Sequence, residues 1–244
     1  IFAHLPMILG GDGARLSKRH GAVSVMAYRD EGFLPEALLN YLSRLGWSHG
    51  DQEIFSLTEI VELFELKDIN KAPASFNQDK LLWLNQEYIK NASTEHLITH
   101  LQWHLNNQSV DVDNGPALPT VVEALKERSK TLVEMTQSMK MFYQDFEAFD
   151  EKLANKQFGD KAPLALLKDK LSLLECWQAD VIKQAVKQVC DELSIGFGKV
   201  GQPFRLALSG DGNAGNIDIV AELVGQERAL ARLDKALDYV VQSS

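Results

Sequence analysis

Residues 10–21 read GGDGARLSKRHG, and this stretch decides how the beginning of the chain folds and what it can bind. The apolar run before it, IFAHLPMIL at residues 1–9, has the pattern of a strand that leads directly into the glycine-rich turn. A strand that ends in a basic, glycine-rich loop is where open α/β sheets bind nucleotides. Because backbone N–H groups and the Lys18 ammonium together neutralise phosphate charge, we predict a phosphate-binding loop. A solvated basic turn is the alternative.

Residues 15–19, RLSKR, resemble the KMSKS loop of class I aminoacyl-tRNA synthetases, in the KLSKR form of the bacterial glutamyl-tRNA synthetases. Arg15 stands where the family usually has lysine, which keeps the charge and changes the donor geometry, and we expect it to be tolerated. The resemblance runs along the whole chain, through the segments HGAVSV (20–25), LPEALLNYL (34–42), LGWS (45–48), FNQDKLLWLN (76–85) and GKVGQPFR (198–205).

The resemblance implies an ATP site at this loop and a two-step reaction in the full-length family enzyme. That enzyme activates glutamate with ATP and Mg²⁺ to glutamyl-adenylate, and then transfers the glutamate to the 3′ end of tRNA(Glu). Lys18 would be the catalytic residue, because its ammonium neutralises charge on the β- and γ-phosphates as pyrophosphate leaves. Arg15, Ser17 and Arg19 would hold the phosphates beside it. Since residues 1–20 would be only the end of the catalytic domain, we expect this chain alone neither to hold ATP and Mg²⁺ nor to charge tRNA.

The composition is that of an ordinary globular protein, with 45% hydrophobic and 24% charged residues among 244. A net charge of −9 argues against a generic nucleic-acid binder and leaves RNA affinity to local arginines and lysines. No apolar run is long enough to span a bilayer, so we expect a cytoplasmic monomer with no membrane partner. Cys176 and Cys190 are too few for a disulfide framework, and we expect both to be buried in helices. A first residue, Ile1, that is not methionine suggests an engineered or proteolytic boundary.

Apolar spacing after the loop predicts a chain that is almost entirely helical. Capping boxes at Ser56–Glu59 and Thr131–Glu134, and a cap at Asn77, mark three helix starts, and Pro119 marks a fourth. Turns are predicted at residues 50–52 and 71–74. The other predicted helices cover residues 35–45, 94–105, 164–175, 180–193, 217–224 and 226–241.

We therefore predict a mainly α fold with a short remnant of an α/β catalytic domain at residues 1–20. The resemblance assigns residues 21–90 to a helical stem-contact domain. It assigns residues 91–162 and 163–244 to two helical subdomains of an all-helical anticodon-binding cage.

Arg128 and Lys130 come just before the cap at Thr131, where a solvated helix end is the ordinary explanation for two basic residues. The resemblance changes this interpretation, because an arginine at this position reads the third anticodon base in the glutamyl-specific family. A guanidinium can pair bidentately with a base edge or stack on its face, and lysine cannot do both. Arg128 therefore implies an enzyme that charges tRNA(Glu) and not tRNA(Gln).

Arg205 follows Pro203 and precedes a glycine- and asparagine-rich loop at residues 209–216. By itself it would be a surface arginine, and the resemblance implies that it contacts the first two anticodon bases. The family also has a Thr-Pro pair on this loop. Here Ala214 and Gly215 take those places, so we assign no base contacts to the loop. Lys199 is a candidate phosphate contact.

His96, His100 and His104 recur every four residues and so fall on one face of a predicted helix. A histidine pair at this spacing can bind zinc. The sequence places no acidic residue or cysteine to complete such a site, and the neighbouring Leu97 and Leu101 indicate a packed amphipathic helix. We interpret the three histidines as packing or surface residues and predict no metal site.

Two alternatives to the synthetase remain open. A stand-alone helical RNA-binding or scaffold module would leave the Lys18 loop without a function, and the length of the gene upstream of Ile1 would distinguish it. A glutaminyl-type synthetase would have an anticodon region resembling β-barrels, whereas this sequence is helical after residue 90.

Overall fold

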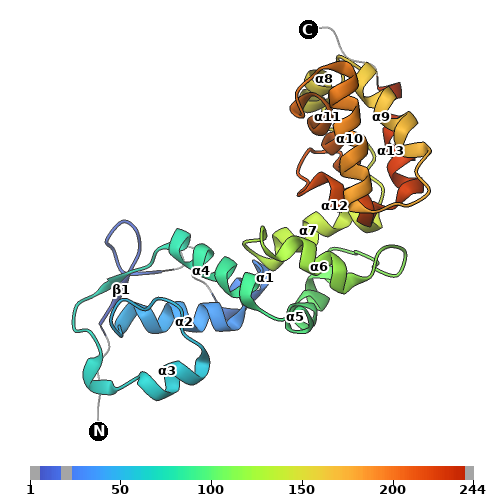
Figure 1. The fold of residues 1–244 in the computed structure, drawn as a ribbon. Coiled ribbons are helices and arrows are strands. Elements are labelled where there is room, and N and C mark those ends of the chain that lie inside the picture. The colour runs from blue at the N-terminus through green and yellow to red at the C-terminus, as the bar shows by residue number, and fades with distance from the viewer. Residues whose placement is uncertain (1–5, 18–23, 240–244) are drawn as a thin grey trace. The chain divides into compact units, whose positions relative to one another are not determined.

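The structure of the chain, a computed structural model, describes residues 6–17 and 24–239 (Figure 1). These residues contain thirteen α-helices and one two-stranded sheet, which confirms the prediction of a mainly α fold. The described part of the chain therefore has the helical architecture that the apolar spacing indicates.

Two compact units make up the chain. The first contains the residues up to Gln108 together with Lys126–Thr136, and the second contains Ser109–Leu125 together with the residues from Gln137 onward. The predicted division into four family domains stays a prediction.

The first unit combines the short sheet with helices that follow it in the chain. Two helices, α6 (Leu118–Lys126) and α7 (Leu132–Tyr143), have residues in both units. The elements that lie wholly in the first unit are β1 (Ile8–Leu9), α1 (Val25–Asp30), α2 (Pro35–Gly46), α3 (Leu57–Leu63), the 3₁₀ turn η2 (Leu66–Asp68), β2 (Ala74–Ser75), α4 (Gln78–Asn91) and α5 (Thr94–Asn107).

The sheet is shorter than the sequence indicates. β1 and β2 pair in parallel, with Ile8 opposite Ala74 and Leu9 opposite Ser75. The strand predicted at residues 1–9 is confirmed at Ile8 and Leu9 and is wrong at Pro6 and Met7, and residues 1–5 lie outside the described part. The turn predicted at 71–74 is wrong at Ala74, which belongs to β2 because its backbone pairs with β1.

The core of the first unit joins α2, α4 and the connection before α2. Its buried cluster consists of Phe33, Leu38, Tyr41, Leu81 and Leu84. Leu81 and Leu84 lie one turn apart on α4, as the 3.6-residue period requires for a single apolar face. The Tyr41 hydroxyl also accepts a hydrogen bond from the Asn77 N–H, at 2.6 Å.

The predicted helix caps are present. Ser56 and Glu59 form a complete capping box at α3, and the Asn77 side chain accepts from the Lys80 N–H at 3.0 Å. The box expected at Thr131 is half confirmed, because the Thr131 hydroxyl accepts from the Glu134 N–H at 3.1 Å. The Glu134 carboxylate accepts instead from the N–H of Lys130, at 2.9 Å, so it closes the turn before the helix.

The second unit is helical throughout its described residues. Besides the parts of α6 and α7, it contains α8 (Glu151–Gln157), α9 (Ala162–Ser172), α10 (Ala179–Leu193), α11 (Gly198–Ser209), α12 (Ile217–Val224) and α13 (Gln226–Asp238). Helix α11 is its centre, because it contacts α8, α9, α10, α12 and α13 (Figure 1).

Helix α11 is not predicted by the sequence, and its composition explains why. It contains Pro203, which lacks the N–H needed for a helical hydrogen bond, and Gly201, a poor helix former. Its buried face, which includes Val200, Phe204 and Leu208, outweighs these costs through tertiary packing. A side chain at Gly201 would place a Cβ 2.6 Å from the exposed Phe197 ring, so the ring would have to move to admit it. Helices α1 and α8 are also unpredicted, and both are short.

The expectation for the cysteines is wrong for Cys176 and only partly met for Cys190. Cys176 is exposed and Cys190 is partly buried. Helix α9 ends at Ser172, three residues before the predicted end, so Cys176 lies in the loop before α10 and not in a helix. Neither cysteine is paired.

Candidate nucleic-acid interface

The glycine-rich loop folds back on the end of β1 as a tight turn. The Gly10 N–H donates to the Ala14 carbonyl at 2.8 Å, and the Leu16 N–H donates to the Ile8 carbonyl at 2.9 Å. Gly13 has a φ of +76°, a conformation that favours glycine. Because the N–H groups of Gly10 and Leu16 already donate inside the turn, they are not available to a phosphate.

The basic residues of this loop are only partly within the described structure. Arg15 is exposed, opposite Leu9 in an antiparallel bridge, and Ser17 is partly buried. Lys18 and Arg19 lie outside the described residues. The arrangement therefore presents Arg15 to solvent on a turn whose shape its own backbone fixes.

Arg128 is exposed on the turn between α6 and α7. This turn is tied to the rest of the first unit at two points. The Asn85 side chain donates from Nδ2 to the Lys130 carbonyl at 2.6 Å, and the Leu132 N–H donates to the Gly32 carbonyl at 2.9 Å. The arginine is thus carried by a backbone that buried polar contacts hold in one conformation.

Arg205 lies on α11 with its side chain partly buried. Its Nη2 is 3.5 Å from the carbonyl of Gly215, one of the two loop positions where the sequence departs from the family pattern. Its Nε is buried and has no hydrogen-bond partner among the described residues. The loop is shaped by Gly210 and Gly212, with φ of +80° and +73°. The guanidinium therefore lies against the glycine-rich loop, with its Nε left without a partner in the described part of the chain.

The two predicted anticodon-reading arginines belong to different compact units, Arg128 to the first and Arg205 to the second. The basic loop at residues 10–17 belongs to the first unit as well. Arg205 therefore stands on a different compact unit from Arg128 and the basic loop.

Helix α13 carries three basic residues that the sequence does not single out as functional, and the structure gives them a structural task. Arg228 Nη1 donates to the Phe142 carbonyl at 2.5 Å, and Lys235 Nζ donates to the Phe146 carbonyl at 2.7 Å. Arg232 is 4% exposed and donates to the carbonyl groups of Leu208 and Gln144 and to the Asp145 carboxylate. These cations neutralise the carbonyl groups at the end of α7 and in the loop after it. Because their side chains are engaged in contacts within the protein, we do not assign them to RNA binding.

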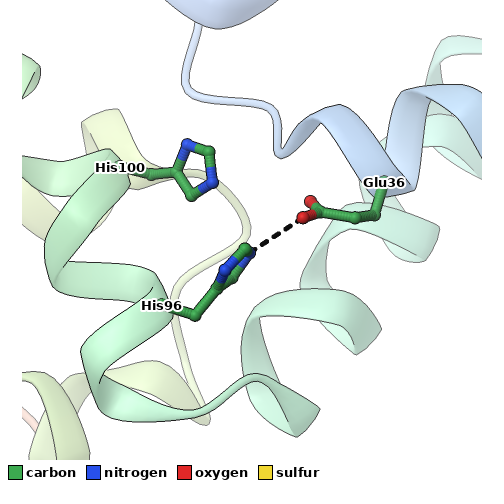
Figure 2. A group of neighbouring side chains, drawn as sticks. All are labelled: Glu36, His96 and His100. Atoms are coloured by element: carbon green, nitrogen blue, oxygen red, sulfur yellow. Dashed lines mark ion pairs between the residues drawn. The ribbon is translucent and has the colours of Figure 1, made fainter.

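Two of the three histidines of α5 come together with an acidic residue from another helix. The Nε2 of His96 is 2.9 Å from Oε1 of Glu36, and the rings of His96 and His100 have centroids 4.7 Å apart (Figure 2). His104 is 2% exposed and packs edge-on against Trp103. Burial and the neighbouring Arg29 guanidinium lower the pKa of His104 below its usual value.

No helix among the described residues has the length and apolar character needed to cross a bilayer.

Two protein families match the chain. The family described as anticodon binding domain matches residues 57–237, and the family described as tRNA synthetases class I (E and Q), catalytic domain, matches residues 1–83. The first of these matches covers well over half of the chain. The chain therefore belongs to the anticodon-binding domain family of the class I tRNA synthetases.

Two curated relatives carry a more specific description than the family does, that of a glutamate–tRNA ligase. A glutamate–tRNA ligase of Ruthia magnifica subsp. Calyptogena magnifica is 69% identical over 237 residues, which are 97% of this chain and 52% of that protein. The glutamate–tRNA ligase of Vesicomyosocius okutanii subsp. Calyptogena okutanii is 68% identical over 238 residues, with 98% and 52% covered. The chain thus spans about half the length of the curated relatives it matches.

Solved structures give the same result. A glutamate tRNA ligase from Elizabethkingia meningosepticum, crystallised in complex with its amino acid, superimposes with a TM-score of 0.83 at 30% identity, over 97% of this chain and 51% of that one. A glutamate-tRNA synthetase from Elizabethkingia anophelis superimposes with a TM-score of 0.82 at 31% identity, over 98% and 51%. The helical fold described above is therefore that of the matching half of these synthetases.

Proposed function

We propose that the chain is the tRNA-binding part of a glutamate–tRNA ligase. The observation that carries this proposal is the match of residues 57–237 to an anticodon-binding domain, within a chain 69% identical to a glutamate–tRNA ligase. The whole protein would join L-glutamate to tRNA(Glu) through glutamyl-adenylate, with ATP converted to AMP and pyrophosphate. The chain alone is expected to bind tRNA and not to carry out this chemistry.

At the loop after β1, the side chains would supply the positive charge for the phosphates of ATP. Four amides of the turn, those of Gly10, Gly13, Ala14 and Leu16, donate hydrogen bonds within it. Arg15 is exposed at the end of the loop, so phosphate binding by cationic side chains fits this turn better than binding by backbone N–H groups. Lys18 would neutralise the phosphates as pyrophosphate leaves, with Arg15, Ser17 and Arg19 beside it. Mg²⁺ would accompany the ATP and share this charge.

Anticodon recognition is proposed for Arg128 and Arg205. Arg128 would read the third anticodon base, since it is exposed on a turn that Asn85 and Gly32 hold in place. Arg205 would contact the first two bases, and Gly215 would orient it through its carbonyl. Single-stranded bases are read by stacking and by contacts to their edges, which a few arginines on a rigid helical frame can supply.

A cytoplasmic monomer is the proposed setting, as expected for an enzyme whose partner is tRNA. The described residues beyond Ser75 form helices and loops and no strand, which counts against a glutaminyl-type anticodon region. A stand-alone scaffold module is disfavoured by the match of residues 1–83 to a synthetase catalytic domain.

Aminoacylation by the complete protein tests this proposal. We expect charging of tRNA(Glu) and not of tRNA(Gln), and we expect Lys18→Ala to lower kcat by about 10²–10³-fold, as the loss of one electrostatic contact to a transition state does. Lys71→Ala, which removes an exposed lysine of the first unit, is the matched control and should leave kcat unchanged. Absence of charging of tRNA(Glu) would overturn the proposed function. ATP–pyrophosphate exchange by residues 1–244 alone would contradict the expectation that this chain is inactive.

A further inference from the structure

Glu36, His96 and His100 bring three metal-ligating side chains to one place in the first unit. Glu36 lies in the first turn of α2, and the two histidines lie one turn apart on α5. One ligand atom from each residue can be chosen so that all three lie within 4.8 Å of one another. Figure 2 shows the two imidazoles one above the other along α5, edge to face, and the Glu36 carboxylate reaching toward them from α2. Two helices that are distant in the sequence thus converge on a common point.

The surroundings hold these side chains in position. The N-terminal end of α5 is capped by Ser93, whose hydroxyl accepts from the His96 N–H at 3.2 Å. Leu97 and Leu101, on the same helix, are fully buried and fix how it packs. The residue before α2, Leu34, is 1% exposed, and its N–H donates to the Asn85 side chain at 2.8 Å. The cluster therefore has the rigid support that a ligand set needs.

One oxygen of Glu36 is left without a partner. Oε1 pairs with His96, while Oε2 is buried and accepts no hydrogen bond from any described residue. A buried carboxylate oxygen without a partner is costly, because it has lost water and gained nothing in exchange. A cation placed between the carboxylate and the imidazoles would satisfy this oxygen. The unpartnered oxygen is an observation independent of the spacing of the histidines.

We propose that Glu36, His96 and His100 bind a divalent transition metal, with zinc the best match. Two imidazole nitrogens and one carboxylate oxygen are a ligand set that zinc uses, and three protein ligands leave a fourth position for water. Calcium and magnesium prefer oxygen ligands only, so the two nitrogens argue against them.

Metal binding requires only a small rearrangement of these side chains. Metal–ligand distances of about 2.0–2.1 Å in a tetrahedral site correspond to about 3.4 Å between ligand atoms. The three ligand atoms lie within 4.8 Å of one another, so binding draws them together by at most about 1.4 Å. The bound ion would link α2 to α5, two helices of the first unit that lie far apart in the sequence. Zinc should therefore raise the unfolding temperature of the chain.

The test is titration of residues 1–244, free of any histidine tag, with ZnCl₂ by calorimetry and with Co²⁺ by visible absorption. We expect one ion per chain and a Co²⁺ spectrum of a four-coordinate nitrogen and oxygen site. Glu36→Gln and His100→Gln should each weaken Zn²⁺ binding by about tenfold or more. His49→Gln is the matched control, because it removes an exposed histidine of the same unit and should leave the affinity unchanged.

Two results would overturn the site. One is the absence of saturable Zn²⁺ and Co²⁺ uptake by the unmodified chain, a measurement that does not depend on whether a variant folds. The other is one-to-one Zn²⁺ binding that survives in folded Glu36→Gln and His100→Gln chains, as circular dichroism would verify. Neither result bears on the proposed synthetase function, which aminoacylation tests separately.

Discussion

The side chain of Asn85 donates to the carbonyl of Lys130 at 2.6 Å, and this contact joins α4 to the turn that carries Arg128. The same side chain accepts from the Leu34 N–H at 2.8 Å, and Asn85 is fully buried. One amide group therefore satisfies the buried Leu34 N–H and also binds the Lys130 carbonyl, which positions the proposed anticodon-reading turn.

Asn85→Ala should lower the free energy of unfolding by about 3 kcal/mol, because it leaves the buried Leu34 N–H without its partner and removes the hydrogen bond to the Lys130 carbonyl. Urea denaturation followed by circular dichroism measures the loss. Asn91→Ala is the control, since Asn91 is exposed and its side chain donates only to the Glu87 carbonyl on its own helix. Equal losses in the two variants would contradict the role given to Asn85.

Gly32→Ala should be more damaging than Gly50→Ala. Both glycines have positive φ, +87° and +53°, so both substitutions introduce backbone strain of about 1–2 kcal/mol. At Gly32 the new Cβ would also lie 2.5 Å from the Val133 N, whereas at Gly50 it meets open space. The difference between the two unfolding free energies measures how closely the Arg128 turn packs on Gly32. A difference near zero would mean that this close packing is absent in solution.

Arg232→Ala should destabilise the second unit by about 3 kcal/mol, because it removes charge-assisted hydrogen bonds to Leu208, Gln144 and Asp145. Thermal unfolding followed by circular dichroism is a suitable measurement. Lys183→Ala, on the exposed side of α10, removes a cation without these contacts and should have little effect. A similar small effect for Arg232→Ala would show that its buried contacts are not formed.

Stability should fall as the pH drops below about 6.5, and His104 should contribute to this fall. Burial and Arg29 lower the pKa of His104 in the folded chain from the value of 6.5, and Asp30 opposes them only in part. The unfolded chain therefore binds this proton at a higher pH than the folded chain does. The unfolding free energy is constant above the unfolded pKa and decreases between it and the lower folded pKa.

Urea titrations at several pH values between 5 and 8, with EDTA present, measure this dependence. His104→Gln should reduce the slope of unfolding free energy against pH in that range, whatever its effect on stability at neutral pH. An unchanged slope would indicate that His104 titrates alike in the folded and unfolded chains.

Local sequence rules predict much of this fold. The starts of α3 and α4 follow from Ser56 and Asn77, and the apolar period of α10 predicts its whole length within one residue. The rules fail where tertiary contacts outweigh local preference. Helix α11 forms around Pro203 because its buried face is large, and β2 forms at Ala74 because β1 lies beside it.

The candidate sites show the same division. The sequence locates Arg128 and Arg205 through a family resemblance. The support that Asn85 gives to the Arg128 turn depends on a contact between distant segments, and the Gly215 carbonyl meets Arg205 through the folding of the loop after α11. Likewise, the spacing of His96 and His100 is visible in the sequence, but Glu36 lies sixty residues earlier and only the packing of α2 near α5 brings it to them.

The most direct test of the central proposal is binding of tRNA(Glu) anticodon stem-loops to residues 1–244. Arg128→Ala should weaken binding of the native stem-loop by about 1–3 kcal/mol and should weaken a stem-loop with a changed third anticodon base much less. Lys130→Ala, which removes a neighbouring charge, should weaken both alike. Equal losses for the two stem-loops on removal of the Arg128 guanidinium would contradict base reading by Arg128.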